Sequence, residues 1–151
     1  MAQQETTAGA EKEFVLGIAA LAVEDSLTAL AHLERVLKLH HHPGWLSFLG
    51  YCIAKERGQH RKGMELCLSS LAAEPDDPAH YYNLGRVQML SGDKEDALRV
   101  LREGMSKGGS PEIVRLLDTF GSRDSLLFPA LSRTNPLNRY LGLLLKRLGL
   151  R

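Results

Sequence analysis

Cysteines and aromatic residues are scarce in this sequence of 151 residues, and long hydrophobic runs are missing. Its two cysteines, Cys52 and Cys67, lie in apolar helical patterns without Cys-x-x-Cys spacing, so we expect two reduced core thiols rather than a disulfide. The ten-residue apolar run 14–23 is too short to span a bilayer. The residues before it are net acidic, whereas a signal peptide starts with basic residues. We therefore expect a cytoplasmic protein without a membrane partner.

The sequence also lacks an excess of one charge. It has 19 basic and 18 acidic side chains, which gives no overall field that would favour a nucleic-acid partner. The charges are unevenly placed, because the residues after Pro111 are net basic and those before it are mildly acidic.

Catalytic and cofactor motifs are missing as well. No Gly-x-x-x-x-Gly-Lys-Ser/Thr loop, Gly-x-Ser-x-Gly turn or His-Glu-x-x-His helix occurs, so we expect neither an enzyme nor a bound cofactor. The run His40-His41-His42 does not predict a metal site, because adjacent side chains on a helix point about 100° apart. No cysteine or carboxylate set with ligand spacing accompanies these histidines.

The pattern that is present is clearest between Pro78 and Gly104. Counting from Pro78, Leu84-Gly85 occupies positions 7 and 8 of a 34-residue unit, and a small and a large residue follow at positions 20 and 24. Stepping back by two units puts the same residue types at these positions, namely Leu16, Gly17, Ala29 and Leu33. The middle unit has Gly63 and Cys67 there, but its Leu49-Gly50 pair comes one residue early, which leaves a local register shift open. Small residues at these positions allow two antiparallel helices to cross closely.

The segment 78–104 resembles a tetratricopeptide repeat (TPR). The resemblance implies an all-α, right-handed α-solenoid of antiparallel helix pairs with C-terminal capping helices. We predict a flexible tail over 1–12 and three TPR-like units within 13–121, with the units at 10–43, 44–77 and 78–111 and a closing helix at 112–120 that Gly121 ends. The alternative is an unrelated helical bundle in which the small residues are incidental.

The resemblance also implies a peptide-binding groove lined by the first helix of each unit. In such repeats positions 2, 5, 9 and 12 face a bound peptide. Here those positions hold Glu11, Phe14, Ile18, Leu21, Trp45, Phe48, Cys52, Lys55, Ala79, Tyr82, Arg86 and Met89. The lysines and asparagines with which some members grip a C-terminal carboxylate are absent, apart from Asn83. The groove would be apolar and aromatic with two cationic points, which suits an apolar or amphipathic peptide.

The segment 122–151 is predicted to contain an extended stretch and an amphipathic helix at 136–148, both packed on the repeats. The alternative is that this basic helix docks to a membrane surface or to a partner. We therefore predict a non-catalytic scaffold or adaptor for a protein partner. A small chaperone that holds one apolar client segment, with a homodimer as a further option, is the other reading.

Overall fold

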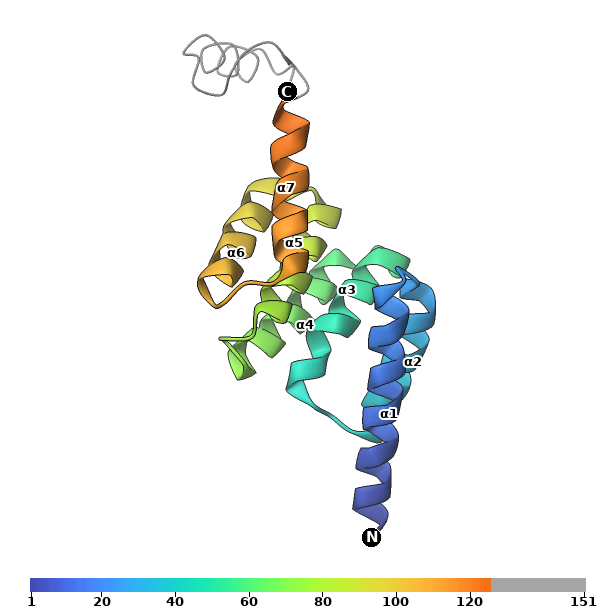
Figure 1. The fold of residues 1–151 in the computed structure, drawn as a ribbon. Helices are drawn as coiled ribbons and strands as arrows, with labels where there is room; N and C mark the ends of the chain where they lie inside the picture. The colour runs from blue at the N-terminus through green and yellow to red at the C-terminus, as the bar shows by residue number, and fades with distance from the viewer. Residues whose placement is uncertain (126–151) are drawn as a thin grey trace. The chain divides into compact units, whose positions relative to one another are not determined.

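The structure is a computed structural model that describes the backbone of residues 1–125 and the side chains of residues 1–120. Within that part of the chain the regular elements are helices, drawn in Figure 1. They are α1 (Ala2–Ala22), α2 (Ser26–Leu39), the 3₁₀ helix η1 (Pro43–Trp45), α3 (Leu46–Arg57), α4 (His60–Ala73), α5 (Pro78–Ser91), α6 (Lys94–Ser106) and α7 (Pro111–Ser125). The chain divides into two compact units, Met1–Val114 and Arg115–Arg151, and the helices from α1 to α6 all lie in the first unit.

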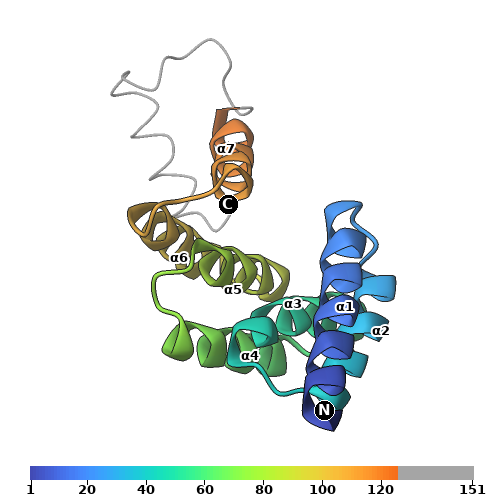
Figure 2. The same ribbon diagram turned by 60° about the horizontal axis from the view of Figure 1, so that its bottom comes forward.

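Consecutive helices of the first unit form the pairs α1–α2, α3–α4 and α5–α6, each joined by a short turn (Figures 1 and 2). Local chemistry sets these turns. Asp25 caps α2 by accepting a hydrogen bond from the backbone N–H of Thr28 at 3.0 Å. Gly58 and Gly92 end α3 and α5 in the left-handed region, with φ of 66° and 88°, where a side chain would be strained. The all-α fold of helix pairs is therefore confirmed.

Each pair crosses at a small residue of its first helix, and the contact is equivalent in all three pairs. A Cβ built on Gly17 would lie 3.1 Å from Leu33, and one on Gly85 would lie 2.7 Å from Leu101. In the middle pair it is Gly50 that lies against Cys67 and against the backbone oxygen of Gly63, 2.6 Å from a built Cβ. Gly50 therefore fills the place of Gly17 and Gly85, so α3 is shifted by one residue relative to the 34-residue spacing.

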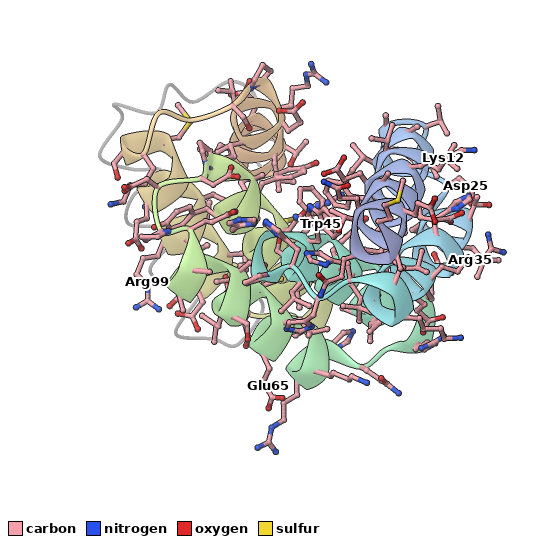
Figure 3. All side chains as sticks on the ribbon, turned by 90° about the horizontal axis from the view of Figure 1, so that it is seen from below. Lys12, Asp25, Arg35, Trp45, Glu65 and Arg99 are labelled. Carbon is pink, nitrogen blue, oxygen red and sulfur yellow. The ribbon has the colours of Figure 1, made fainter. Side chains whose placement is uncertain are left out.

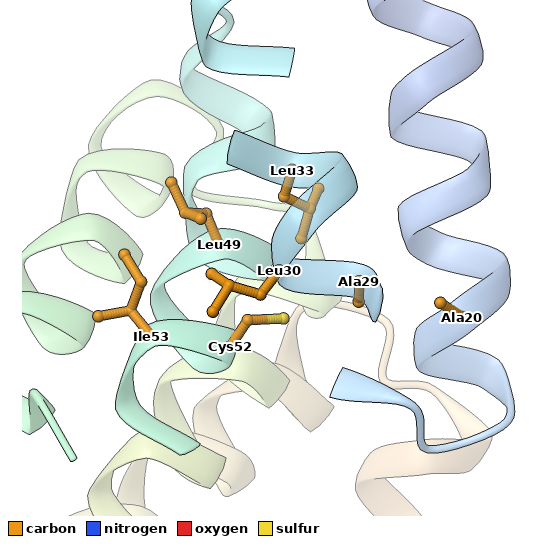
Figure 4. Close-up of a cluster of buried hydrophobic side chains, with 7 residues drawn as sticks. All are labelled: Ala20, Ala29, Leu30, Leu33, Leu49, Cys52 and Ile53. Carbon is orange, nitrogen blue, oxygen red and sulfur yellow. The ribbon is translucent and has the colours of Figure 1, made fainter. Parts of the chain in front are cut away.

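The core of the first two pairs is a continuous apolar cluster shown in Figure 4. Its buried members come from α1, α2 and α3 and are Ala20, Ala29, Leu30, Leu33, Leu49, Cys52 and Ile53. A second cluster joins the pair α3–α4 to the pair α5–α6 through Ala54, Cys67, Tyr81, Leu84, Val87 and Val100. Each pair therefore buries its apolar surface against the next pair, as expected of a solenoid.

The predicted flexible tail over 1–12 is wrong, because α1 begins at Ala2. Once residues 13–22 are helical, the helix extends backwards without a second nucleation step, and alanine, glutamine and glutamate are good helix formers. The hydroxyl of Thr7 donates a hydrogen bond back to the Gln3 carbonyl at 2.8 Å, and Ala10 is fully buried. Most of this stretch is exposed, as its low hydrophobicity indicates, but it is helical rather than disordered.

The predicted helix end at Gly121 is also wrong, because α7 continues to Ser125. A single glycine costs a helix only about 1 kcal/mol, so it does not by itself terminate one. The start at Pro111 agrees with the sequence, and Ile113 near this start is fully buried. The predicted helix at 136–148 lies outside the described residues.

Candidate protein-binding face

Half-buried aromatic side chains gather on the first helix of each pair. We call this set the aromatic face, and it consists of Phe14, Trp45, Phe48, Tyr51 and Tyr82. The first comes from α1, the last from α5, and the other three from η1 and α3. Figure 3 shows Trp45 lying among the helices, whereas Glu65 and Arg99 project outward.

The rings at one end of the aromatic face are stacked. The centroid of Trp45 lies 4.8 Å from that of Phe14 and 4.8 Å from that of His42, and both pairs are close to parallel. Phe14 also meets Phe48 edge to face at 5.5 Å. Aromatic pairs of this kind each contribute about 0.5–1.5 kcal/mol beyond their buried area. The stack therefore fixes the position of Trp45, the last residue of the short 3₁₀ helix η1.

Arg86 lies at the other end, against two tyrosine rings. Its guanidinium carbon is 3.4 Å from the ring centroid of Tyr51 and 4.3 Å from that of Tyr82. The ammonium of Lys55 lies 5.8 Å from the centre of the Tyr51 ring. Cations over aromatic faces gain about 0.5–2 kcal/mol, more when water is excluded. This end of the face is therefore aromatic and positively charged.

A buried chain of hydrogen bonds lies between α3 and α5. The Asn83 side-chain amide donates to Ser47 Oγ at 2.9 Å, and Ser47 Oγ lies 2.8 Å from His80 Nδ1. On the other side of the ring, His80 Nε2 lies 2.7 Å from a carboxylate oxygen of Glu74. All of these groups are satisfied if Ser47 donates to Nδ1 and Nε2–H donates to Glu74, which assigns the tautomer of His80.

Glu74, His80 and Ser47 are linked in the same order as an acid–histidine–serine catalytic triad, but they lie where no substrate can reach the serine. Ser47 and His80 are both 0% exposed, so the serine hydroxyl meets no substrate in this structure. Its oxygen already has two protein partners. The chain of hydrogen bonds therefore joins α3 to α5 and fixes the helices that carry the aromatic face.

Among residues 1–120, one group of side chains has the chemistry to hold a metal ion. Glu74, Asp77 and His80 offer ligand atoms within 4.8 Å of one another, although sequence reasoning expected no metal site. The carboxylate of Glu74 already forms a hydrogen bond with His80, so this group is satisfied without an ion. The histidine run lies elsewhere, and its members His40 and His42 contact the ring of Trp45.

Both cysteines are free and buried, in accord with the prediction of core thiols. Burial raises the pKa of the Cys52 thiol to about 12, and it does the same for the pKa of Cys67. Because the thiolate is the reactive form, neither side chain is suited to nucleophilic chemistry.

The predicted site residues lie on the first helices of the pairs or directly before them, and the structure brings Phe14, Trp45 and Phe48 into ring contact and Arg86 against Tyr82. Half-buried residues there are Phe14, Ile18, Leu21, Trp45, Phe48, Ala79, Tyr82, Arg86 and Met89, while Glu11 and Lys55 are exposed. Cys52 is the exception, because it is fully buried in the core cluster. Tyr51 takes its place on the face because α3 is shifted by one residue. The early Leu49-Gly50 pair was the sequence signal for this shift.

Comparison with known proteins agrees with this geometry. No protein-family model matches the sequence. Among solved structures, the chain is similar to the crystal structure of the Sgt2 TPR domain from Aspergillus fumigatus, with a TM-score of 0.60 and 20% sequence identity over 84% of this chain and 87% of that one. The fold is therefore that of a TPR domain, as the sequence resemblance implied. Within the described part of the chain, no helix is both long enough and apolar enough to cross a membrane.

Proposed function

We propose that this chain is a non-catalytic protein-binding module and that the aromatic face receives an apolar or amphipathic peptide segment of its partner. The observation that carries the proposal is the gathering of five aromatic side chains from α1, η1, α3 and α5 of a TPR fold, all partly exposed. Aromatic side chains are enriched among the residues that dominate binding energy, and a single surface aromatic is common, whereas a set gathered from several helices is not.

The rigidity of the face supports the same proposal. Phe14, Trp45 and Phe48 hold one another by ring contacts, and the helices that carry them are joined by buried apolar clusters. A surface that is already ordered loses little side-chain entropy when a ligand binds. Peptide binding here therefore requires no rearrangement of the helix pairs.

The test uses Trp45, the single tryptophan of the sequence, as an intrinsic fluorescent reporter. A random 12-residue peptide library displayed on phage is selected against the intact chain. Enriched peptides are then titrated into the wild-type protein and into Phe14→Leu and Tyr82→Ala variants. Phe14→Leu keeps an apolar side chain against the core but removes the ring stacked on Trp45.

We expect enriched peptides to shift the Trp45 emission and to bind each variant at least about tenfold more weakly, as expected for a contact worth more than about 1.4 kcal/mol. Leu68→Ala is the control, because Leu68 is an exposed residue of α4 outside the aromatic face. Equal affinity for wild-type protein and both aromatic variants would refute the proposal. Indiscriminate binding of any apolar peptide at the same face would instead favour a chaperone that holds apolar segments.

A further inference from the structure

Arg86 lacks an ionic partner in the part of the chain that the structure describes. One of its terminal nitrogens donates to the side-chain oxygen of Asn83, and its guanidinium lies against the rings of Tyr51 and Tyr82. Its Nε is buried and has no hydrogen-bond partner among the described residues. Guanidinium groups carry five N–H donors, so most of the donors of this side chain have no acceptor within residues 1–120.

Acidic side chains of α1, of α3 and of the turn before α5 have other partners. Glu13 on α1 pairs with His32 at 2.7 Å, and Glu56 on α3 accepts a hydrogen bond from the hydroxyl of Ser26. Glu74 binds His80. By contrast, arginines on the second helices of the pairs have their own carboxylates, such as Arg99 on α6 with Asp96 at 2.8 Å and Arg61 on α4 with Glu65 at 3.4 Å. Arg86, which lies against two rings of the aromatic face, thus has no carboxylate partner among the described residues.

We propose that Arg86 is the anion anchor of the aromatic face and that it binds the carboxylate of an aspartate or glutamate side chain set among apolar residues of the partner peptide. The inference rests on the proposed function, because it specifies the chemistry of the peptide bound there. Two tyrosine rings and Asn83 hold the guanidinium in place, so its planar fork is ready to donate two parallel hydrogen bonds. The exposed ammonium of Lys55 adds positive charge at the same end of the face.

The apolar part of the ligand follows from the same arrangement. Phe48 and Tyr51 lie on one helix, three residues apart, so the charged end and the stacked rings form one continuous strip across α3. An acidic side chain at Arg86 therefore places neighbouring apolar side chains of the peptide on the rings of Phe48 and Trp45. A purely apolar peptide would cover the half-buried guanidinium of Arg86 without offering its terminal N–H groups an acceptor, which is unfavourable.

The test continues with the peptides selected against the intact chain. A library peptide on phage is joined to the coat protein through its C-terminus, so the selection offers side-chain carboxylates and no free terminal one. An enriched peptide and its counterpart with the acidic residue changed to the amide are titrated against wild-type, Arg86→Met and Arg86→Lys proteins. Arg99→Met is the matched control, because Arg99 lies on α6 and already pairs with Asp96 at 2.8 Å.

We expect enriched peptides to share an acidic residue within an apolar segment. Changing that residue to the amide, or Arg86 to Met, should each weaken binding about 10- to 100-fold, and the two changes together should cost little more than either one. Arg86→Lys should give a smaller loss, since the charge remains but the fork is lost. Arg99→Met should have no effect. Thermal melting establishes that each variant is folded, and the amide peptide tests the contact on unaltered protein.

Other outcomes separate this inference from the function on which it rests. Enriched peptides without an acidic residue that bind wild-type and Arg86→Met proteins equally, but lose affinity for Phe14→Leu, would overturn the role of Arg86 and leave the binding face in place. Binding only of synthetic peptides with a free C-terminal carboxylate, or only of phosphorylated peptides, would also overturn the proposed ligand. Failure to select any peptide that responds to the aromatic variants would overturn the proposed function itself.

Discussion

Replacing Gly63 by alanine tests the backbone contact at which α3 and α4 cross. A Cβ at this position would lie 2.6 Å from the carbonyl oxygen of Gly50 and 2.9 Å from the Cβ of Ala54. Neither atom belongs to a flexible side chain, so the two helices must move apart to admit the methyl group. That movement disturbs the contact between Gly50 and Cys67 as well.

The change in the free energy of unfolding of Gly63→Ala is the balance of two effects. Overpacking a close contact costs about 1–3 kcal/mol, and we take the upper end because the clash is with backbone. Alanine offsets about 1 kcal/mol of this cost, because its helix propensity is higher than that of glycine. The net loss is about 2 kcal/mol, which for a chain of this length lowers the melting temperature by about 4–8 °C. Gly50→Ala meets the Gly63 oxygen at 2.6 Å and should behave in the same way.

Gly9→Ala is the control within the same protein. Gly9 lies inside α1, and a Cβ there would have only Leu39 near it, at 4.0 Å. The helix preference then acts alone, so this variant should be more stable by about 1 kcal/mol. Urea unfolding followed by circular dichroism measures all three variants. A Gly63→Ala protein as stable as the wild type would refute the close crossing and, with it, the one-residue shift of α3.

Four further predictions concern the core, the buried polar chain and the titrating groups. Ala97→Leu should lower the free energy of unfolding by about 1–3 kcal/mol in urea titrations, because Ala97 is 0% exposed at a helix crossing. Ser47→Ala should lower it by a similar amount, because two buried nitrogen atoms lose their shared partner; no loss would mean that water replaces the hydroxyl. Burial raises the pKa values of Cys52 and Cys67 to about 12, so both thiols should react with a thiol reagent at pH 8 only after unfolding. For the same reason the free energy of unfolding should fall as pH rises above about 8.5, where the thiols ionise in the unfolded chain but not in the folded one. The hydrogen bond from Thr28 lowers the pKa of Asp25. The ionised side chain therefore stabilises the fold fully above the ordinary pKa of about 3.9, and this stabilisation is lost as pH falls through the lowered pKa of the folded state. The Asp25→Asn variant should accordingly lose less stability than wild type between pH 5 and pH 3.

Much of the fold could be read from the sequence because the signals are local. Asp25 and Gly92 mark where helices begin and end through hydrogen bonds and backbone angles that depend on neighbouring residues alone. Small residues such as Ala29 and Ala97 recur at the crossings because two backbones approach there, and both are fully buried. The helix pairs, their order and the aromatic character of the first helices were therefore predictable.

Packing between helices decided which side chains of α3 face the core and which face the surface. Each residue of a helix lies about 100° around the axis from the next, so a shift of one residue exchanges a core position for a surface one. The contact of Gly50 with Gly63 sets that rotation for α3, and it puts Cys52 in the core and Tyr51 on the aromatic face. The placement of Arg86 against Tyr51 depends on the same rotation. The sequence by itself determined the repeat and its chemistry, whereas which side chains meet across neighbouring helices was decided by the tertiary structure, because that depends on steric fit between segments far apart in the chain.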